Sequence, residues 1–160
     1  MKHVEEINVG IDTSKTQLDI FIRHVGEFFS VENNTQGIKA ALKCIIFYLP
    51  TRIIIEASGR LELPFACAAS KAKLPVVVAN ALHVHKFIVS TGQLAKTDKL
   101  DAQKIAHYGE ALKPRLTEIK ANNIKRFSDL LVRRSQLIDM HTMEKNRDSI
   151  MNKEVKRSNQ

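Results

Sequence analysis

The stretch RIIIEA, residues 52–57, decides how this chain folds. Its three consecutive isoleucines show no polar alternation, which is typical of a short strand buried on both faces of a sheet. Pro50 precedes the stretch, and a Ser58-Gly59 turn follows it. Because a carboxylate next to three isoleucines is costly to desolvate unless it is paired, Glu56 at the carboxyl end of this strand is a candidate functional residue.

Helices and strands alternate in the chain after this strand. Apolar periodicity predicts a helix over about 61–73, and a second apolar strand, VVVAN, follows at 76–80. The strand–helix–strand order implies a parallel pair joined by a right-handed crossover. Two more helices are predicted, one over 81–90 and one that begins near Asp98 and ends at Pro114.

Three further strands are predicted before RIIIEA. Residues 7–11 are β-branched or small and apolar up to Asp12, where the polar TSKTQ begins. Apolar side chains alternate with others over 18–23, and FFSVEN at 28–33 can continue as a partner strand. The pattern indicates an antiparallel meander. Thr35 is the expected cap of the helix that follows.

The order of these elements predicts the fold class. Three antiparallel strands, a helix, and then two strands flanked by helices is the order found in the ribonuclease H-like fold. From about Asn122 the chain has no Pro or Gly, and its apolar residues recur at helical spacing, which predicts a long C-terminal helix. We therefore expect an α/β domain with a mixed five-stranded sheet over residues 1–118, and a helical, coiled-coil-type arm over 119–160.

The charge of the chain favours polyanionic partners. It carries 25 Lys and Arg against 17 Asp and Glu, a formal charge of +8. Residues 119–160 hold ten basic and five acidic side chains, so the arm is the more basic part. Such an imbalance is weak support for nucleic-acid binding when taken alone.

The cysteines and the apolar runs indicate a cytoplasmic protein. Cys44 and Cys67 both lie in apolar stretches, which predicts two buried free thiols and a reducing compartment. The N-terminus lacks the apolar core of a signal peptide, and no run approaches the roughly 20 apolar residues of a membrane span. No membrane partner is expected.

Four acidic residues, Asp12, Glu56, Asp98 and Asp101, form the main candidate site. Asp12 and Glu56 end two strands, so their carboxylates would emerge together if those strands are neighbours. Asp98 and Asp101, three apart at a helix start, can face the same way. Four carboxylates at one point repel each other unless cations neutralise them. Two Mg²⁺ or Mn²⁺ ions roughly 3.5–4 Å apart would do so and would support phosphodiester chemistry.

Each acid also has a structural interpretation. Asp12 could cap the turn after its strand, and Asp98 and Asp101 could be the N-cap and N3 residues of an ordinary helix. The sequence contains nothing that resembles a zinc site, a phosphate-cradling GxxxxGK[ST] loop or a GxGxxG turn. The combination of the four acids therefore favours a metal site.

Six basic residues are candidates for phosphate contacts. Two lie next to the acids, and four form a stripe on the predicted arm, where a solvated helix face is an equally good interpretation. They are Lys15, Lys96, Lys125, Arg126, Arg133 and Arg134.

Three motifs resemble the DEDD recombinases, which comprise the transposases of a large bacterial insertion-sequence family and the Piv-type pilin-gene invertases. The motifs are VGIDTSK around Asp12, IIIEASG around Glu56, and AKTDKLDAQKIA around Asp98 and Asp101. The last of these is the most specific, and the resemblance covers roughly residues 5–115. One departure is Ala81, where the family pattern has a proline.

The resemblance implies a RuvC-like catalytic domain that cleaves and exchanges DNA strands. It implies that Asp12, Glu56, Asp98 and Asp101 bind the catalytic metal ions. A coiled-coil region would follow, and then a separate C-terminal domain with a serine nucleophile, which lies outside these 160 residues. Double-stranded DNA is the expected partner, at the bacterial nucleoid. A homo-oligomer formed through the C-terminal helix is also expected, and RNA is a further candidate because some family members use a structured guide RNA.

Two alternatives stay open at this point. The first is a RuvC-like nuclease that resolves Holliday junctions by hydrolysis without rejoining. The second is a non-catalytic nucleic-acid-binding or oligomerisation module in which the acids are structural.

Overall fold

One mixed sheet lies at the centre of the domain. Its strands are β1 (Asn8–Thr13), β2 (Gln17–Ile22), β3 (Glu27–Glu32), β4 (Arg52–Glu56) and β5 (Val76–Ala79). In this computed structural model, which describes residues 6–92, 95 and 97–158, the strand order is β3-β2-β1-β4-β5. β2 runs antiparallel to β1 and β3, and β4 runs parallel to β1 and β5. This mixed five-stranded topology confirms the predicted ribonuclease H-like fold.

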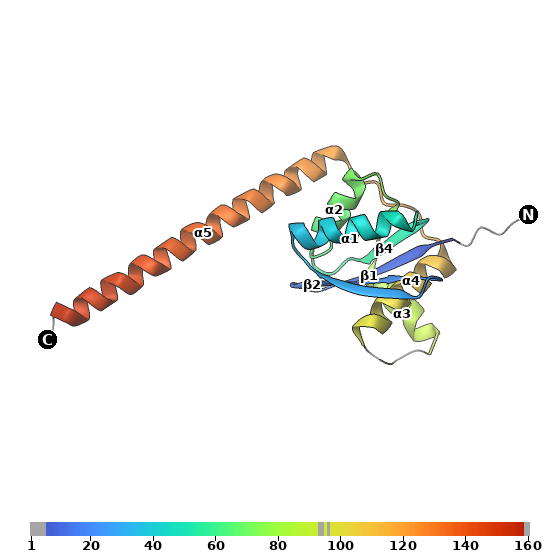
Figure 1. Cartoon of the computed structure of the whole chain (residues 1–160), viewed down its shortest axis with the longest axis horizontal. Helices are drawn as coiled ribbons and strands as arrows, with labels where there is room; N and C mark the ends of the chain where they lie inside the picture. The colour runs from blue at the N-terminus through green and yellow to red at the C-terminus, as the bar shows by residue number, and fades with distance from the viewer. Residues whose placement is uncertain (1–5, 93–94, 96, 159–160) are drawn as a thin grey trace, which may run out of the picture. The chain divides into compact units, whose positions relative to one another are not determined.

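Helices cover both faces of the sheet. α1 (Thr35–Phe47) and α2 (Leu63–Lys71) lie on one face, and α3 (Ala81–Ser90) and α4 (Asp98–Leu112) lie on the other (Figure 1). The helix α5 (Ala121–Ser158) follows, as the sequence predicted. The chain divides into two compact units, Met1–Glu118 and Ile119–Gln160. The acids Asp12, Glu56, Asp98 and Asp101 therefore all belong to the first unit.

The isoleucines of β4 are buried on both faces, as expected from RIIIEA. Ile53, Ile54 and Ile55 are each 0% exposed. Ile54 packs with Val84 of α3 and Tyr108 of α4. Because successive strand side chains point to opposite faces, Ile53 and Ile55 belong to the α1/α2 side. That side is apolar along the whole of β4, whereas the α3/α4 side ends in the carboxylate of Glu56.

Two glycines let α4 lie unusually close to the sheet. A Cβ at Gly10 in β1 would meet the backbone oxygen of Ala102 and the backbone nitrogen of Ala106. A Cβ at Gly109 in α4 would meet the side chain of Ile54. Only glycine allows this approach, because any side chain would push the helix away from β1. The position of α4, which carries two of the four acids, therefore depends on Gly10.

Two local predictions on α1 were wrong. Its N-cap is Asn34, whose side-chain oxygen accepts a hydrogen bond from Gly37 N at 2.8 Å, rather than Thr35. Cys44 is exposed, and only Cys67 is buried. Cys44 stands in the largely apolar stretch LKCIIF, but its side chain lies with that of Lys43 on the solvent side of the helix, and composition alone did not indicate this.

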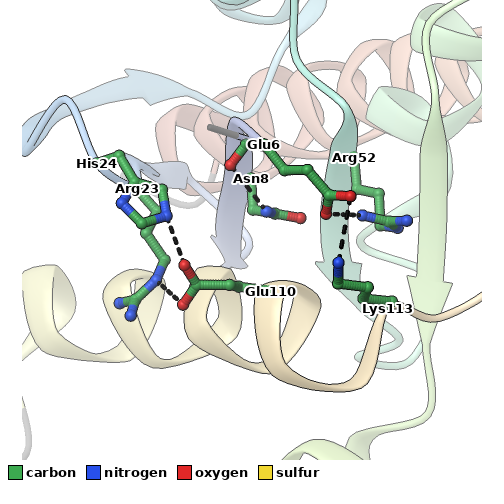
Figure 2. A network of polar contacts seen from close by, with 7 residues as sticks. All are labelled: Glu6, Asn8, Arg23, His24, Arg52, Glu110 and Lys113. Carbon is green, nitrogen blue, oxygen red and sulfur yellow. Dashed lines mark hydrogen bonds and ion pairs between the residues drawn. The ribbon is translucent and has the colours of Figure 1, made fainter. Parts of the chain in front are cut away.

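Polar contacts tie α4 and the neighbouring loops to the sheet at the end remote from the four acids (Figure 2). Glu110 of α4 accepts a hydrogen bond from Arg23 Nε at 2.5 Å and also contacts His24. Glu6 pairs with Arg52 at 2.9 Å and with Lys113 at 3.3 Å. These contacts join residues 46 to 107 positions apart in sequence. They therefore fix the C-terminal end of α4 against β2 and β4.

We expect Glu110→Gln to destabilise the domain at neutral pH and not at low pH. Burial by itself raises the pKa of Glu110, but the hydrogen bonds and charges of Arg23 and His24 outweigh burial and hold that pKa below its ordinary value. A carboxylate with a lowered pKa contributes stability above its unfolded pKa, near 4.5, and loses it as the pH falls through the folded value. Solvent screening limits the contribution to about 1 kcal/mol.

Thermal unfolding from pH 7 to pH 3 checks this expectation. The melting temperature of Glu110→Gln should lie about 4 °C below that of the wild type at pH 7, and the two should converge below pH 4. Arg23→Met should give a similar loss at pH 7, and the double variant should lose little more than either single one, because both remove the same pair. A difference that persists unchanged at pH 3 would contradict the ionic origin of the effect.

The helix α5 has an exposed apolar stripe. Leu130, Leu137 and Ile138 are each 47–57% exposed, and they share one face of the helix with Arg133, Arg134 and His141. The role of this helix as an interaction arm stays a prediction. Among the described residues, no helix has the length and apolar character required to cross a bilayer.

Candidate active site

One row of side chains crosses the sheet at the carboxyl ends of its central strands. Asp12 of β1 pairs with Asp19 of β2, and Ile11 pairs with Ile55, so Asp12 and Glu56 come next to each other on parallel strands. Strand alternation places Asp12 and Glu56 on the same face as Gly10 and Ile54, which is the α4 side. The sheet therefore brings the first two predicted acids together on the face that α4 covers.

The N-terminus of α4 supplies the other two acids. Thr97 is its N-cap, and Thr97 Oγ1 accepts a hydrogen bond from Leu100 N at 3.2 Å. Asp98 and Asp101 lie in the first turn. The alternative in which Asp98 is the N-cap and Asp101 is N3 is therefore wrong, because Thr97 already performs the capping. Neither carboxylate is required by the helix cap.

The carboxyl groups influence one another across the site. Burial raises the pKa of Asp12, and the hydrogen bond that Thr13 N donates to its Oδ1 at 2.9 Å only partly offsets this rise. The negative charges of Asp101, Asp19 and Asp98 raise the pKa of Asp12 further, in that order.

Glu56 shows the same behaviour. Burial raises the pKa of Glu56 first, and the charges of Asp12 and Asp101 then raise it further. Two half-buried carboxylates with raised pKa values in one place hold charge at a cost in free energy. A bound cation would remove that cost.

Lys104 forms an ion pair with Asp101. Its side chain is only 6% exposed, and Lys104 Nζ lies 3.4 Å from Asp101 Oδ1. The same ammonium donates a hydrogen bond to the backbone oxygen of Ala95 at 2.5 Å. Lys104 thus connects α4 to the segment that precedes it and partly neutralises Asp101. Sequence reasoning did not single out Lys104, since a lysine in such a helical stretch is usually exposed.

The carboxylate oxygens of these acids suit a hard divalent cation, but in this structure they do not converge on a single ion position. Half-buried carboxylate oxygens without cysteine or histidine are the ligands that Mg²⁺ and Mn²⁺ prefer. Among the residues that the structure describes, no three His, Cys, Asp or Glu side chains lie close enough together to hold a metal ion. Asp12 is within electrostatic reach of Asp98 and Asp101, and Glu56 is within electrostatic reach of Asp12 and Asp101.

Asp19 is a fifth acid of the row, which sequence reasoning missed. It is 6% exposed, and its Oδ1 accepts hydrogen bonds from Gln17 Nε2 at 2.7 Å and from Ser30 Oγ at 2.5 Å. The alternation of residues 18–23 suggested a strand with one polar face. The desolvation argument applied to Glu56 could have identified Asp19 too, because it also stands among apolar strand residues.

The basic candidates lie on exposed surfaces. Lys15 is exposed in the turn between β1 and β2, directly after the first acid. The arm residues Lys125, Arg126, Arg133 and Arg134 are also exposed. Lys96 lies outside the described residues. Of the basic candidates that the structure describes, Lys15 is the one closest to Asp12 in sequence.

A family model described as a transposase, of the DEDD type, matches residues 9–150 of this sequence. The chain belongs to the DEDD transposase family. The matched range includes all four acids and most of α5. The DEDD transposase match agrees with the resemblance found in the three sequence motifs.

Two curated relatives of this DEDD transposase chain are pilin gene-inverting proteins. The protein of Moraxella lacunata is 33% identical, and that of Moraxella bovis is 32% identical, each over 85% of this chain. The chain spans 45% of the length of each relative. Among solved structures, the RuvC structure of Thermus thermophilus matches with a TM-score of 0.47 and 16% identity, over 62% of this chain and 90% of that one.

Proposed function

We propose that this chain is the N-terminal catalytic domain of a metal-dependent DNA recombinase, a transposase or a site-specific invertase. The observation that supports the proposal best is the meeting of Asp12 and Glu56 on adjacent parallel strands, within electrostatic reach of Asp101 on α4. Family membership and the similarity to two inverting proteins agree with it. Because the chain spans less than half of those relatives, we assign complete strand exchange to the whole protein.

The four acids would act as ligands of Mg²⁺ or Mn²⁺, with two ions in the site. Bound there, the metal would supply Lewis-acid activation of an attacking oxygen and stabilisation of the leaving oxygen. Asp12 and Glu56 are held on the sheet, so they would fix the position of the ions. Asp101 lies beside the Lys104 ammonium and would exchange that contact for a metal contact.

Mn²⁺ should stabilise the isolated chain against heat. A ligand that binds only the folded state at about 100 times its Kd adds about 2.7 kcal/mol, which corresponds to a rise in Tm of roughly 5–10 °C for a domain of this size. EDTA should reverse the shift, and Glu56→Gln should remove most of it. Scanning calorimetry makes the measurement. No shift with saturating Mn²⁺ would support instead the non-catalytic module.

The proposed partners follow from charge and family. Double-stranded DNA would be bound by Lys15 and Lys96 near the acids and by the basic side chains of α5, namely Lys125, Arg126, Arg133 and Arg134. The apolar stripe of α5 would pair with another copy in a homo-oligomer. A structured guide RNA would compete for the same basic surface. With DNA as its partner, the protein would act at the nucleoid.

An assay with four-way DNA junctions distinguishes a recombinase from a nuclease that only resolves such junctions. The chain is incubated with junctions and Mg²⁺, and the products are resolved on a denaturing gel. For a recombinase domain that needs the rest of its protein, we expect no symmetric pair of nicks. Symmetric nicks made by this chain alone would favour the junction-resolving nuclease.

A further inference from the structure

The fifth acid, Asp19, lies outside the four acids of the family motifs, and the role inferred for it rests on the proposed function. We propose that Asp19 is a positioning residue for the metal site, which holds negative charge beside Asp12 and thereby strengthens cation binding without itself being one of the four ligands. Its contacts, its burial and its place in the sheet support this role.

The sheet register places Asp19 directly beside Asp12. The two are cross-strand partners in the antiparallel pair of β1 and β2, on the face that α4 covers. Like charges directly opposite one another in an antiparallel pair are destabilising. The charge of Asp19 also acts on Asp12 more strongly than that of Asp98 does. A fold without a cation to bind would gain from an uncharged residue at this position.

The protein nevertheless holds Asp19 in place with dedicated donors. Ser30 is its partner on the other side, on β3, and donates a hydrogen bond to Asp19 Oδ1 at 2.5 Å. Gln17 donates a second hydrogen bond to the same oxygen at 2.7 Å. Both contacts anchor one carboxylate oxygen and leave the second oxygen without a hydrogen bond from either donor. The charge is thus held in a fixed orientation rather than neutralised, since neither donor is cationic.

Phe21 and Ala102 contribute apolar surroundings on the same face of the sheet as Asp12 and Asp19. Both are buried, and they pack together between β2 and α4. Electrostatic attraction is stronger where water is excluded, so the buried Asp19 carboxylate would act on a cation bound at Asp12 with less screening than an exposed carboxylate would. This arrangement resembles the hydrogen-bonded carboxylates that orient and tune metal ligands in other proteins.

Asp19→Asn tests the proposal, because the amide keeps the shape and can accept the same hydrogen bonds. Isothermal titration of the 160-residue chain with Mn²⁺ at pH 7.5 should give an affinity roughly 10-fold weaker than that of the wild type. In metal-free buffer, the Tm of Asp19→Asn should be equal to or higher than that of the wild type, because the repulsion with Asp12 is gone. Weaker Mn²⁺ binding without any loss of thermal stability is a result that a merely structural aspartate would not produce.

Two control variants separate charge from packing. Glu118→Gln removes one exposed carboxylate from the same unit and should leave both Mn²⁺ affinity and Tm unchanged. Ser30→Ala removes a hydrogen bond to Asp19 but keeps its charge, and should retain most of the affinity.

The outcomes distinguish this inference from the proposed function. A wild-type affinity in Asp19→Asn together with a lower Tm would overturn the inference alone. If the wild-type chain takes up no Mn²⁺, the proposed function fails and the inference fails with it. Weaker binding in Asp19→Asn, with wild-type stability and intact binding by Glu118→Gln, supports the inference.

Discussion

Asp12→Asn should abolish DNA recombination by the complete protein while leaving the domain folded. The change removes a carboxylate that adjoins Glu56 and lies within electrostatic reach of Asp101, so the metal site would lose the charge at its centre. Metal ions contribute several kcal/mol of transition-state stabilisation, and each 1.36 kcal/mol is a factor of ten in rate. The frequency of inversion or transposition should therefore fall by about three orders of magnitude or more.

The pKa of Asp12 explains why unfolding would not account for this loss. A carboxyl group whose pKa is raised in the folded state lowers the stability of the protein once the pH exceeds its unfolded pKa, near 3.8. The metal-free domain therefore carries that cost at pH 7, which lies above the unfolded pKa, and asparagine removes it. The Tm of metal-free Asp12→Asn should thus equal or exceed that of the wild type.

Asp148→Asn is the matched control for the recombination assay. It makes the same chemical change at an exposed position of α5, and recombination should continue at the wild-type level. Recombination by Asp12→Asn at the wild-type frequency would falsify the proposed role of the acids.

Gly10→Val should unfold the domain or displace α4 from the sheet. The new Cβ would overlap backbone atoms at Ala102 and Ala106, which cannot rotate away as a side chain would. Overpacking a core typically costs about 1–3 kcal/mol and sometimes more. With a backbone obstacle we expect a loss of at least about 3 kcal/mol, a large part of the stability of an ordinary domain.

Urea unfolding measures this loss, with Gly10→Ala as the graded variant. Gly59→Ala is the matched control, because a Cβ there meets nothing within 4 Å, although its φ of 65° adds a strain of about 1 kcal/mol. The expected order of stability is wild type, then Gly59→Ala, then Gly10→Ala, then Gly10→Val. If Gly10→Ala were as stable as the wild type, the close packing of α4 on β1 would be contradicted.

The strands and helices could be predicted from the sequence wherever one pattern dominated. The isoleucines of β4 indicated a strand buried on both faces, and the helix over 81–90 has the bounds that were expected. The cap of α1 was predicted one residue late because Asn34 and Thr35 are both good N-cap residues. The two residues differ in backbone conformation, since Asn34 is extended and Thr35 begins the helix, and the sequence does not show which of them is extended.

The site was harder to predict from the sequence because the positions of its side chains depend on contacts between different strands and helices. The strand-end positions of Asp12 and Glu56 followed from local patterns, and the register of β1 and β4 then placed them together. The alternation in β2 assigned Asp19 to a polar face and did not reveal that it is only 6% exposed, so only a desolvation argument like the one applied to Glu56 could have identified it. The Lys104 contact with Ala95 is tertiary in origin.

The alternation of β1 also limits how this protein could be altered by insertion or deletion. Gly10 and Asp12 occupy the same face of one strand, the first to admit α4 and the second to meet Glu56. A single inserted residue between them would turn Asp12 toward the apolar face beneath α1 and α2 and leave its neighbour facing the acids. The spacing GID is therefore under a parity constraint: a change in its length by one residue cannot be tolerated, and Ile11 at its middle position, which is 0% exposed, can be replaced only by an apolar side chain of similar volume.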